Sequence, residues 1–122
     1  MHAFDVLGDE VRRRIVELLA PGEQPAGVLT DVIRAEFGIS QPAVSQHLRI
    51  LRDAGFATAR PDGVRRIYTL DSAGLDAAEA ELRRLRAPLS QRLDALHTEI
   101  ARGARSTAAS TRTTPSLKRD TA

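Results

Sequence analysis

The feature that most constrains this chain is a short helix whose two ends are both encoded in the sequence. Ser40 is a preferred N-cap residue, and Pro42 falls in the first turn, where its missing N–H is not needed. Gly55 can take the left-handed conformation that closes a helix, and Phe56 beyond it can pack back onto Leu51. We therefore predict a helix of about 14 residues between Ser40 and Gly55.

Three helical stretches precede this one, and the first contains Phe4, Val6 and Leu7. Asp9 is placed as the N-cap of a helix that runs to about Ala20 and stops at Pro21-Gly22. The next helix ends at Gly38, two residues before the following helix begins, and this tight connection indicates a helix-turn-helix. We expect the triplet Arg12-Arg13-Arg14 to lie on a solvated face. Apolar residues at helical spacing mark the helix that ends at Gly38, namely Val28, Leu29, Val32, Ile33 and Phe37.

A β-hairpin and a long helix follow. Residues 57–60 and 65–70 alternate around Asp62-Gly63, which is typical of two strands joined by a tight turn. Beyond them an apolar stripe recurs every three or four residues. Pro88 should kink or divide this helix, and Gly103 should end it. The stripe comprises Leu75, Ala78, Leu82, Leu85, Leu89, Leu93, Leu96 and Ile100.

This order of elements predicts a mainly α fold with a small β-hairpin wing, a winged helix-turn-helix. The stripe exceeds what one helix needs against so small a domain, so we expect part of it to be buried by a second subunit in a symmetric homodimer. Burial of the stripe within one chain is the alternative. We assign residues 1–102 to a DNA-binding and dimerisation domain. Residues 103–122, rich in Ser, Thr, Ala and Arg, are predicted to be a disordered basic tail.

Composition excludes several classes of protein. The chain has no cysteine, which rules out disulfides, thiolate metal sites and cysteine nucleophiles. No apolar run approaches the roughly 20 residues of a membrane span, and nothing at the N-terminus resembles a signal peptide. We therefore expect a cytoplasmic protein with no membrane partner. Ser45 and His47, two apart on a helix, cannot form a nucleophile–base pair, and no enzyme is expected.

The basic side chains that suit nucleic acid are concentrated locally. The net charge is only +2, but residues 39–68 hold five arginines against Asp53 and Asp62. On a helical wheel of residues 41–54, one face is apolar and packs into the domain. The opposite face suits the major groove of double-stranded DNA, and the hairpin arginines suit the minor groove or backbone. We predict DNA contacts from Gln41, Pro42, Ser45, Gln46, Arg49, Arg60, Arg65 and Arg66.

Three segments resemble the ArsR/SmtB family of repressors. Residues 38–56 (GISQPAVSQHLRILRDAGF) and 65–70 (RRIYTL) are similar to its recognition helix and wing, and residues 7–19 (LGDEVRRRIVELL) to its opening helices. The similarity spans about residues 4–102. It implies an operator-binding homodimer whose first and last helices form the subunit interface. It also points to Gln41, Ser45 and Gln46 as the residues that read bases.

The sequence departs from that family at the metal sites. The cysteine pair is absent, and the last helix carries only His97, accompanied by Asp94 and Glu99. Asp94 and His97 share a helix face, but a surface histidine is the better interpretation than half a ligand set. We therefore predict no metal and no cofactor. Whether an unknown small molecule or a partner protein acts as effector is left open.

Two other functions agree with parts of the pattern. A winged-helix protein-interaction module explains the apolar core but not the placement of the arginines. A general chromatin-type binder explains the charge but not the polar residues Gln41, Ser45 and Gln46. A sequence-specific repressor explains the outer face of the helix over residues 41–54, the arginine wing and the long apolar stripe together.

Overall fold

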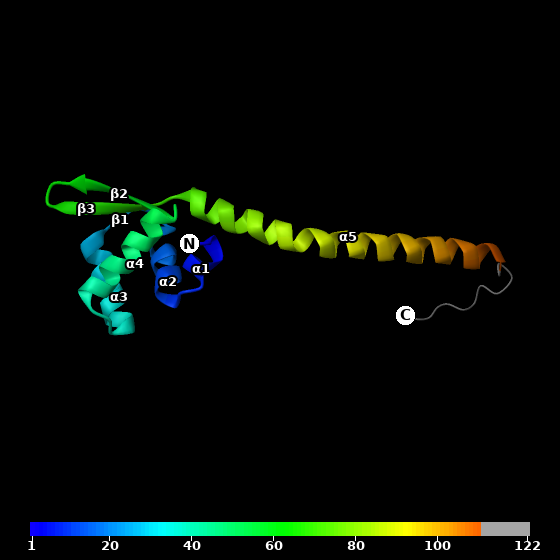
Figure 1. Cartoon of the computed structure of the whole chain (residues 1–122), viewed down its shortest axis with the longest axis horizontal. Coiled ribbons are helices and arrows are strands. Elements are labelled where there is room, and N and C mark those ends of the chain that lie inside the picture. Colours follow the sequence, from blue (N-terminus) through cyan, green and yellow to red (C-terminus); the bar gives the residue numbers. More distant parts are fainter. Residues whose placement is uncertain (111–122) are drawn as a thin grey trace. The chain divides into compact units, whose positions relative to one another are not determined.

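The computed structural model describes the backbone of residues 1–110 and the side chains of residues 1–104 (Figure 1). Its contacts divide the chain into two units, Met1–Glu81 and the part from Leu82 onward. The first unit contains the predicted winged helix-turn-helix. The elements are α1 (Ala3–Leu7), α2 (Glu10–Leu19), β1 (Gln24–Pro25), α3 (Ala26–Phe37), α4 (Gln41–Asp53), β2 (Ala57–Asp62), β3 (Arg65–Leu70) and α5 (Ser72–Ser110).

The helix-turn-helix is bounded by the residues that the sequence marks. Gly38 has a φ of 67° and ends α3 in the left-handed conformation. Two residues later the Ser40 hydroxyl accepts a hydrogen bond of 3.3 Å from the N–H of Ala43, which caps α4. The same device starts α2, where the Asp9 carboxylate accepts from the N–H of Arg12 at 3.1 Å. The predicted starts of α2 and α4 and the end of α3 are confirmed.

The end of α4 is a Schellman motif, and it also positions the start of α5. Gly55, with a φ of 80°, donates its N–H to the Arg52 carbonyl at 3.1 Å. Phe56 donates to the Leu51 carbonyl at 2.8 Å, which completes the pair of bonds that defines the motif. The carbonyl of Gly55 then accepts from Gly74 at 2.7 Å. One glycine therefore closes α4 and ties it to the first turn of α5.

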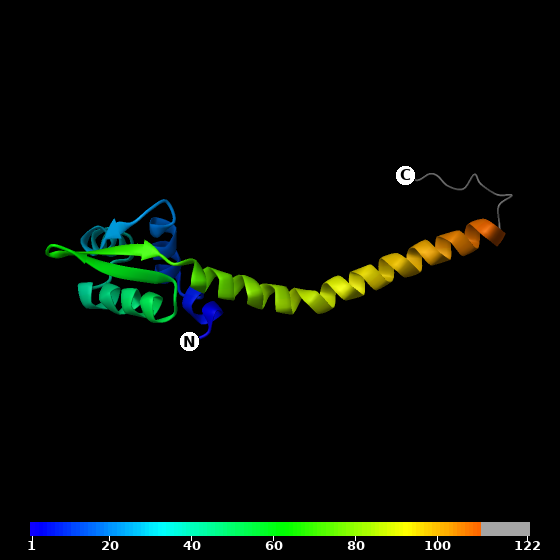
Figure 2. The same ribbon diagram turned by 90° about the horizontal axis from the view of Figure 1, so that it is seen from above.

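The sheet is antiparallel, with β3 at its centre and β1 and β2 at its edges. Strands β2 and β3 are joined by Gly63 and Val64, with Asp62 opposite Arg65, so the predicted hairpin is confirmed, with β2 reaching Asp62 instead of Arg60. Figures 1 and 2 show this hairpin projecting beyond the helices of the first unit as a wing. Strand β1 was not predicted, since a strand of two residues has no alternation to detect.

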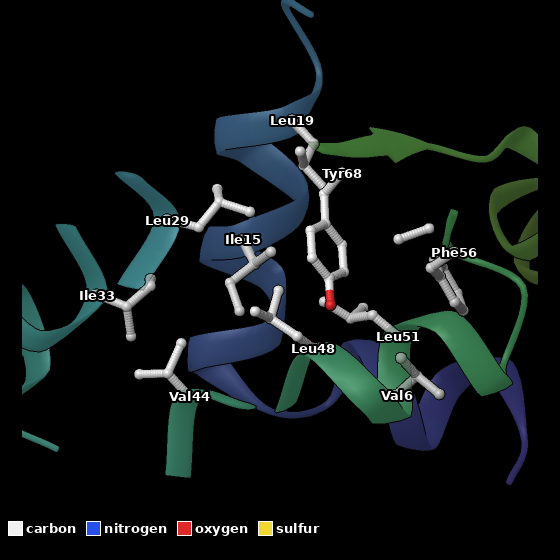
Figure 3. Close-up of a cluster of buried hydrophobic side chains, with 11 residues drawn as sticks. Val6, Ile15, Leu19, Leu29, Ile33, Val44, Leu48, Leu51, Phe56 and Tyr68 are labelled. Carbon is white, nitrogen blue, oxygen red and sulfur yellow. The ribbon is translucent and has the colours of Figure 1, made fainter. Parts of the chain in front are cut away.

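The core lies where α2, α3 and α4 meet beneath β3 (Figure 3). Helix α4 contributes Val44, Leu48 and Leu51, none more than 4% exposed, which confirms the predicted inner face. Tyr68 of β3 and Phe56 close the cluster on the side of the sheet. The other labelled core residues are Val6, Ile15, Leu19, Leu29 and Ile33.

Helix α5 is longer than expected. Pro88 lies inside one helix and does not divide it, and the helix passes Gly103 and continues to Ser110. The expected division at Pro88 and the expected end at Gly103 are wrong, because the surrounding Ala, Leu, Arg and Glu are strong helix formers, whereas the alternative of a kink at Pro88 stays a prediction. Residues 103–110 of the predicted tail are therefore helical, and residues 111–122 lie outside the described residues. Within residues 1–110 no helix is long and apolar enough to cross a membrane.

Candidate nucleic-acid interface

Helix α4 separates its residues into two faces. The apolar face is buried in the core, and the five residues predicted to contact DNA from this helix are all exposed. Because the capped N-terminus of α4 carries free N–H groups and a partial positive charge, it favours an anionic partner. We call the exposed face the polar strip of α4, made of Gln41, Pro42, Ser45, Gln46 and Arg49.

The three predicted arginines of the wing are exposed, but they are not equivalent. Arg60 donates to both carboxylate oxygens of Glu23 at 2.8 and 2.9 Å, and Arg65 donates to Asp62 at 3.0 Å. For Arg66 the described part of the chain shows no such partner. The sequence did not reveal the Arg60 pair, because Glu23 lies 37 residues away.

Part of the predicted site comes together in one groove of about 360 Å³, formed by α3, α4 and β3. Gln41, Ser45 and Arg49 of the polar strip line it, and Arg66 of the wing enters it from β3. Arg60 and Arg65 are not among its lining residues. The groove thus runs along α4 from Gln41 to Arg52 and reaches the wing at Arg66 and Tyr68.

The arginine triplet of α2 lies only partly on a solvated face, since Arg13 is exposed but Arg12 is buried. Arg12 is only 9% exposed, and its guanidinium donates to the carbonyls of Val6 at 2.9 Å and Asp5 at 3.0 Å. Arg13 donates to the carbonyl of Leu7 at 2.6 Å. Arg12 and Arg13 therefore tie α1 to α2. The expectation of exposure is wrong for Arg12. Its partners are backbone carbonyls, and the pattern of side chains in the sequence cannot reveal a contact with the backbone.

The third arginine of the triplet forms an ion pair across two helices. Arg14 holds Glu36 of α3 with two hydrogen bonds of 2.8 and 2.9 Å. These bonds raise the pKa of Arg14 and lower the pKa of Glu36. The pair is surface-exposed, so it connects α2 to α3 without adding much to stability.

His47 faces the inside of the domain rather than DNA. Its Nδ1 lies 3.3 Å from a guanidinium nitrogen of Arg12 and 3.9 Å from the carboxylate of Asp9. His47 therefore packs against the domain. Burial raises the pKa of Asp9, but the hydrogen bond from the Arg12 N–H and the charges of His47 and Arg12 outweigh it, so the pKa is lowered overall.

The candidate metal residues lie on α5. Asp94, His97 and Glu99 are all exposed. Among the residues that the structure describes, no three His, Asp or Glu side chains gather in a way that could hold a metal ion.

Comparison with known proteins agrees with this geometry. A family model described as a helix-turn-helix domain matches residues 7–60. The HTH-type transcriptional regulator Rv2034 of Mycobacterium tuberculosis is 44% identical over 82 residues, which are 67% of this chain and 73% of that protein. The transcriptional repressor SdpR of Bacillus subtilis is 32% identical over 74 residues, which are 61% of this chain and 78% of SdpR.

Solved structures give the same result. The crystal structure of a possible transcriptional regulator for arsenical resistance is 39% identical to this chain. The two structures superimpose with a TM-score of 0.63 over 78% of this chain and 95% of the chain in that crystal structure. Proteins of this kind regulate transcription and are not enzymes. The chain therefore belongs to the ArsR/SmtB family of winged helix-turn-helix proteins, the DNA-binding repressors of transcription.

Proposed function

We propose that this chain acts in the cytoplasm as a homodimer that represses transcription by binding a palindromic operator in double-stranded DNA. The polar strip of α4 carries the proposal. It presents amide and hydroxyl groups at the N-terminal half of a helix whose opposite face is fixed in the core, and this is the arrangement that reads base edges in the major groove. Gln41, Ser45 and Gln46 are the proposed base-reading residues.

The wing supplies the proposed contacts to the backbone or the minor groove. Arg66 can contact DNA without giving up a partner. Arg60 must first release Glu23, and Arg65 must release Asp62, before either can bind a phosphate. Both pairs are about half exposed, so this exchange costs little. The slope of log K against log salt should still increase with each arginine that neutralises a phosphate.

Dimerisation is supported by the apolar stripe of α5. From Leu82 to Ile100 its six large side chains are 49% to 69% exposed in the single chain. A stripe of this length on one helix face is typical of a helix that packs against a second copy. A symmetric dimer would present two copies of α4 to half-sites about one turn of DNA apart.

An electrophoretic mobility shift with the DNA upstream of the chain's own gene tests the proposal. Protection of one palindrome in the presence of competitor DNA supports it. No shift at low salt would instead favour a protein-interaction module, and equal binding to all sequences would favour a general chromatin-type binder.

The base-reading role is tested with Gln46→Ala. We expect it to weaken operator binding by about 1–3 kcal/mol and to leave binding to random DNA nearly unchanged. Gln91→Ala, the same change at an exposed position of α5, is the matched control. If Gln46→Ala left the discrimination between operator and random DNA intact, the proposed orientation of α4 would be wrong. Any effector, small molecule or protein, would appear as a compound or partner that changes this shift.

A further inference from the structure

The nine arginines of the winged unit fall into two groups. Five are engaged by carboxylates or carbonyls of the chain itself: Arg12, Arg13, Arg14, Arg60 and Arg65. The other four have no side-chain hydrogen bond or ion pair with the part of the chain that the structure describes: Arg34, Arg49, Arg52 and Arg66.

The four arginines without partners all line the same groove. It is the groove of about 360 Å³ between α3, α4 and β3, and Asp31 is the only carboxylate among its lining residues. Cations that converge without counter-charges repel one another, and clefts lined by one sign of charge attract ions of the opposite sign. The other five arginines are paired within the chain, but these four line one groove without a partner, so the groove is suited to an anionic ligand.

Arg52 gives a second, independent indication. Its Nε is buried and has no hydrogen-bond partner among the described residues. A buried donor without a protein partner costs free energy, and a bound anion would supply the acceptor that this donor lacks. Arg52 is half-buried on α4, so its side chain is already partly ordered and loses little entropy when it binds.

We propose that this groove binds a phosphate group, and that the group is a backbone phosphodiester of the DNA whose bases face Gln41 and Ser45. The proposal rests on the DNA-binding function proposed above. Guanidinium groups bind phosphate oxygens through paired, charge-assisted hydrogen bonds, and several can share one phosphate. Gln41 and Ser45 line the groove as well as the polar strip, so a bound phosphate lies beside the bases that they read.

The proposal enlarges the interface to include α3. Arg34 lies near the end of α3, outside the predicted basic segment, and Arg52 lies on the flank of the polar strip. Asp31 acts in the opposite sense, because its carboxylate weakens the attraction of the groove for an anion.

Salt-dependent DNA binding of four variants tests the proposal on the full chain. Arg52→Gln and Arg34→Gln should each weaken binding and lower the slope of log K against log salt, by at most about 0.9 because the arginines share one phosphate, on upstream DNA and on a random duplex alike. Asp31→Asn should tighten binding to both duplexes. Arg14→Gln is the matched control, since it removes the same charge at a paired site outside the groove and should leave the slope unchanged.

Titration with inorganic pyrophosphate distinguishes the source of the phosphate. If Arg52→Gln abolished pyrophosphate binding but kept the wild-type salt slope, the assignment to the DNA backbone would be overturned in favour of a free phosphorylated molecule. Unchanged slopes together with unchanged pyrophosphate binding would overturn the phosphate site itself. The gain expected for Asp31→Asn cannot arise from misfolding. Preference of the wild type for upstream over random DNA reports on the proposed function separately.

Discussion

At the scale of single residues, Gly74 is the glycine at which an added Cβ would lie closest to its neighbours. A Cβ at this position would lie 2.5 Å from ring carbons of Phe56, which is fully buried. Gly74→Ala must therefore displace the Phe56 ring or the first turn of α5. We expect the free energy of unfolding to fall by about 1–3 kcal/mol, measured by urea denaturation.

The matched control is Gly27→Ala. Gly27 is also helical, and a Cβ there meets nothing within 4 Å. This change should be neutral or should stabilise the protein by about 0.5–1 kcal/mol, because alanine costs less backbone entropy in a helix. Equal stability of the two variants would contradict the close packing at Gly74.

Arg12 is a second residue whose role is structural. Its planar guanidinium reaches two carbonyls of α1 and the ring of His47 at once, which the single ammonium of lysine cannot do. Arg12→Lys should lower the free energy of unfolding by about 1–3 kcal/mol, since a buried carbonyl is left unsatisfied. Thermal unfolding checks this, with Arg14→Lys as the control at an exposed pair. A loss confined to Arg14→Lys would refute the role given to Arg12.

At the scale of elements, the start of α2 depends on the charge of Asp9 as well as on its cap. Asn is as good an N-cap, so Asp9→Asn keeps the capping hydrogen bond and removes the charge. Near neutral pH we expect the wild type to be more stable by a few tenths to about 1 kcal/mol, because a carboxylate interacts favourably with the helix N-terminus.

This difference should depend on pH. The pKa of Asp9 is lowered in the folded state, so its contribution is complete above the pKa of the unfolded chain. It is lost as the pH falls through the lowered pKa of the folded chain, because the protonated carboxyl has no charge to offer. Denaturation of both proteins from neutral pH to about pH 3, below the unfolded Asp pKa of about 3.9, measures the gap. A constant difference over this range would show that charge plays no part.

Elements whose ends are set by local residues could be predicted from the sequence. Ser40, Gly38 and Gly55 act through their own backbone or that of the next few residues, so α3, α4 and the turn between them were predicted. The length of α5 was not, because Pro88 and Gly103 only weaken a helix, and the outcome depends on all the helix formers around them.

In the candidate site too, features set by local sequence were predicted and features set by tertiary contacts were not. The polar strip of α4 follows from a helical wheel and was predicted completely. The partners of the arginines were not, because they are set by tertiary contacts. Glu23 reaches Arg60 from the loop before β1, and Arg34 joins the groove from α3. Neither residue carries a local signal that points to this role.

At the scale of the whole molecule, the pattern on α5 favours packing of two copies. Leu82, Leu85 and Leu89 are repeated eleven residues later by Leu93, Leu96 and Ile100. Eleven residues span three turns at 3.67 residues per turn, close to the natural period of the helix. The stripe therefore stays on one side of the helix, and it offers a continuous apolar face to a second copy.

Leu93→Asp tests this dimer, because it places a carboxylate in the middle of the stripe, where Leu93 is 56% exposed in the single chain. A symmetric dimer carries the change twice, so the loss of two buried leucines should weaken association by about 3 kcal/mol or more, roughly a hundredfold in Kd. Sedimentation equilibrium at micromolar concentration measures it. Thr98→Asp, on the opposite side of the same helix, adds the same charge and should leave the dimer intact. A wild type that sediments as a monomer would contradict the assignment of the stripe, and so would equal effects of the two variants.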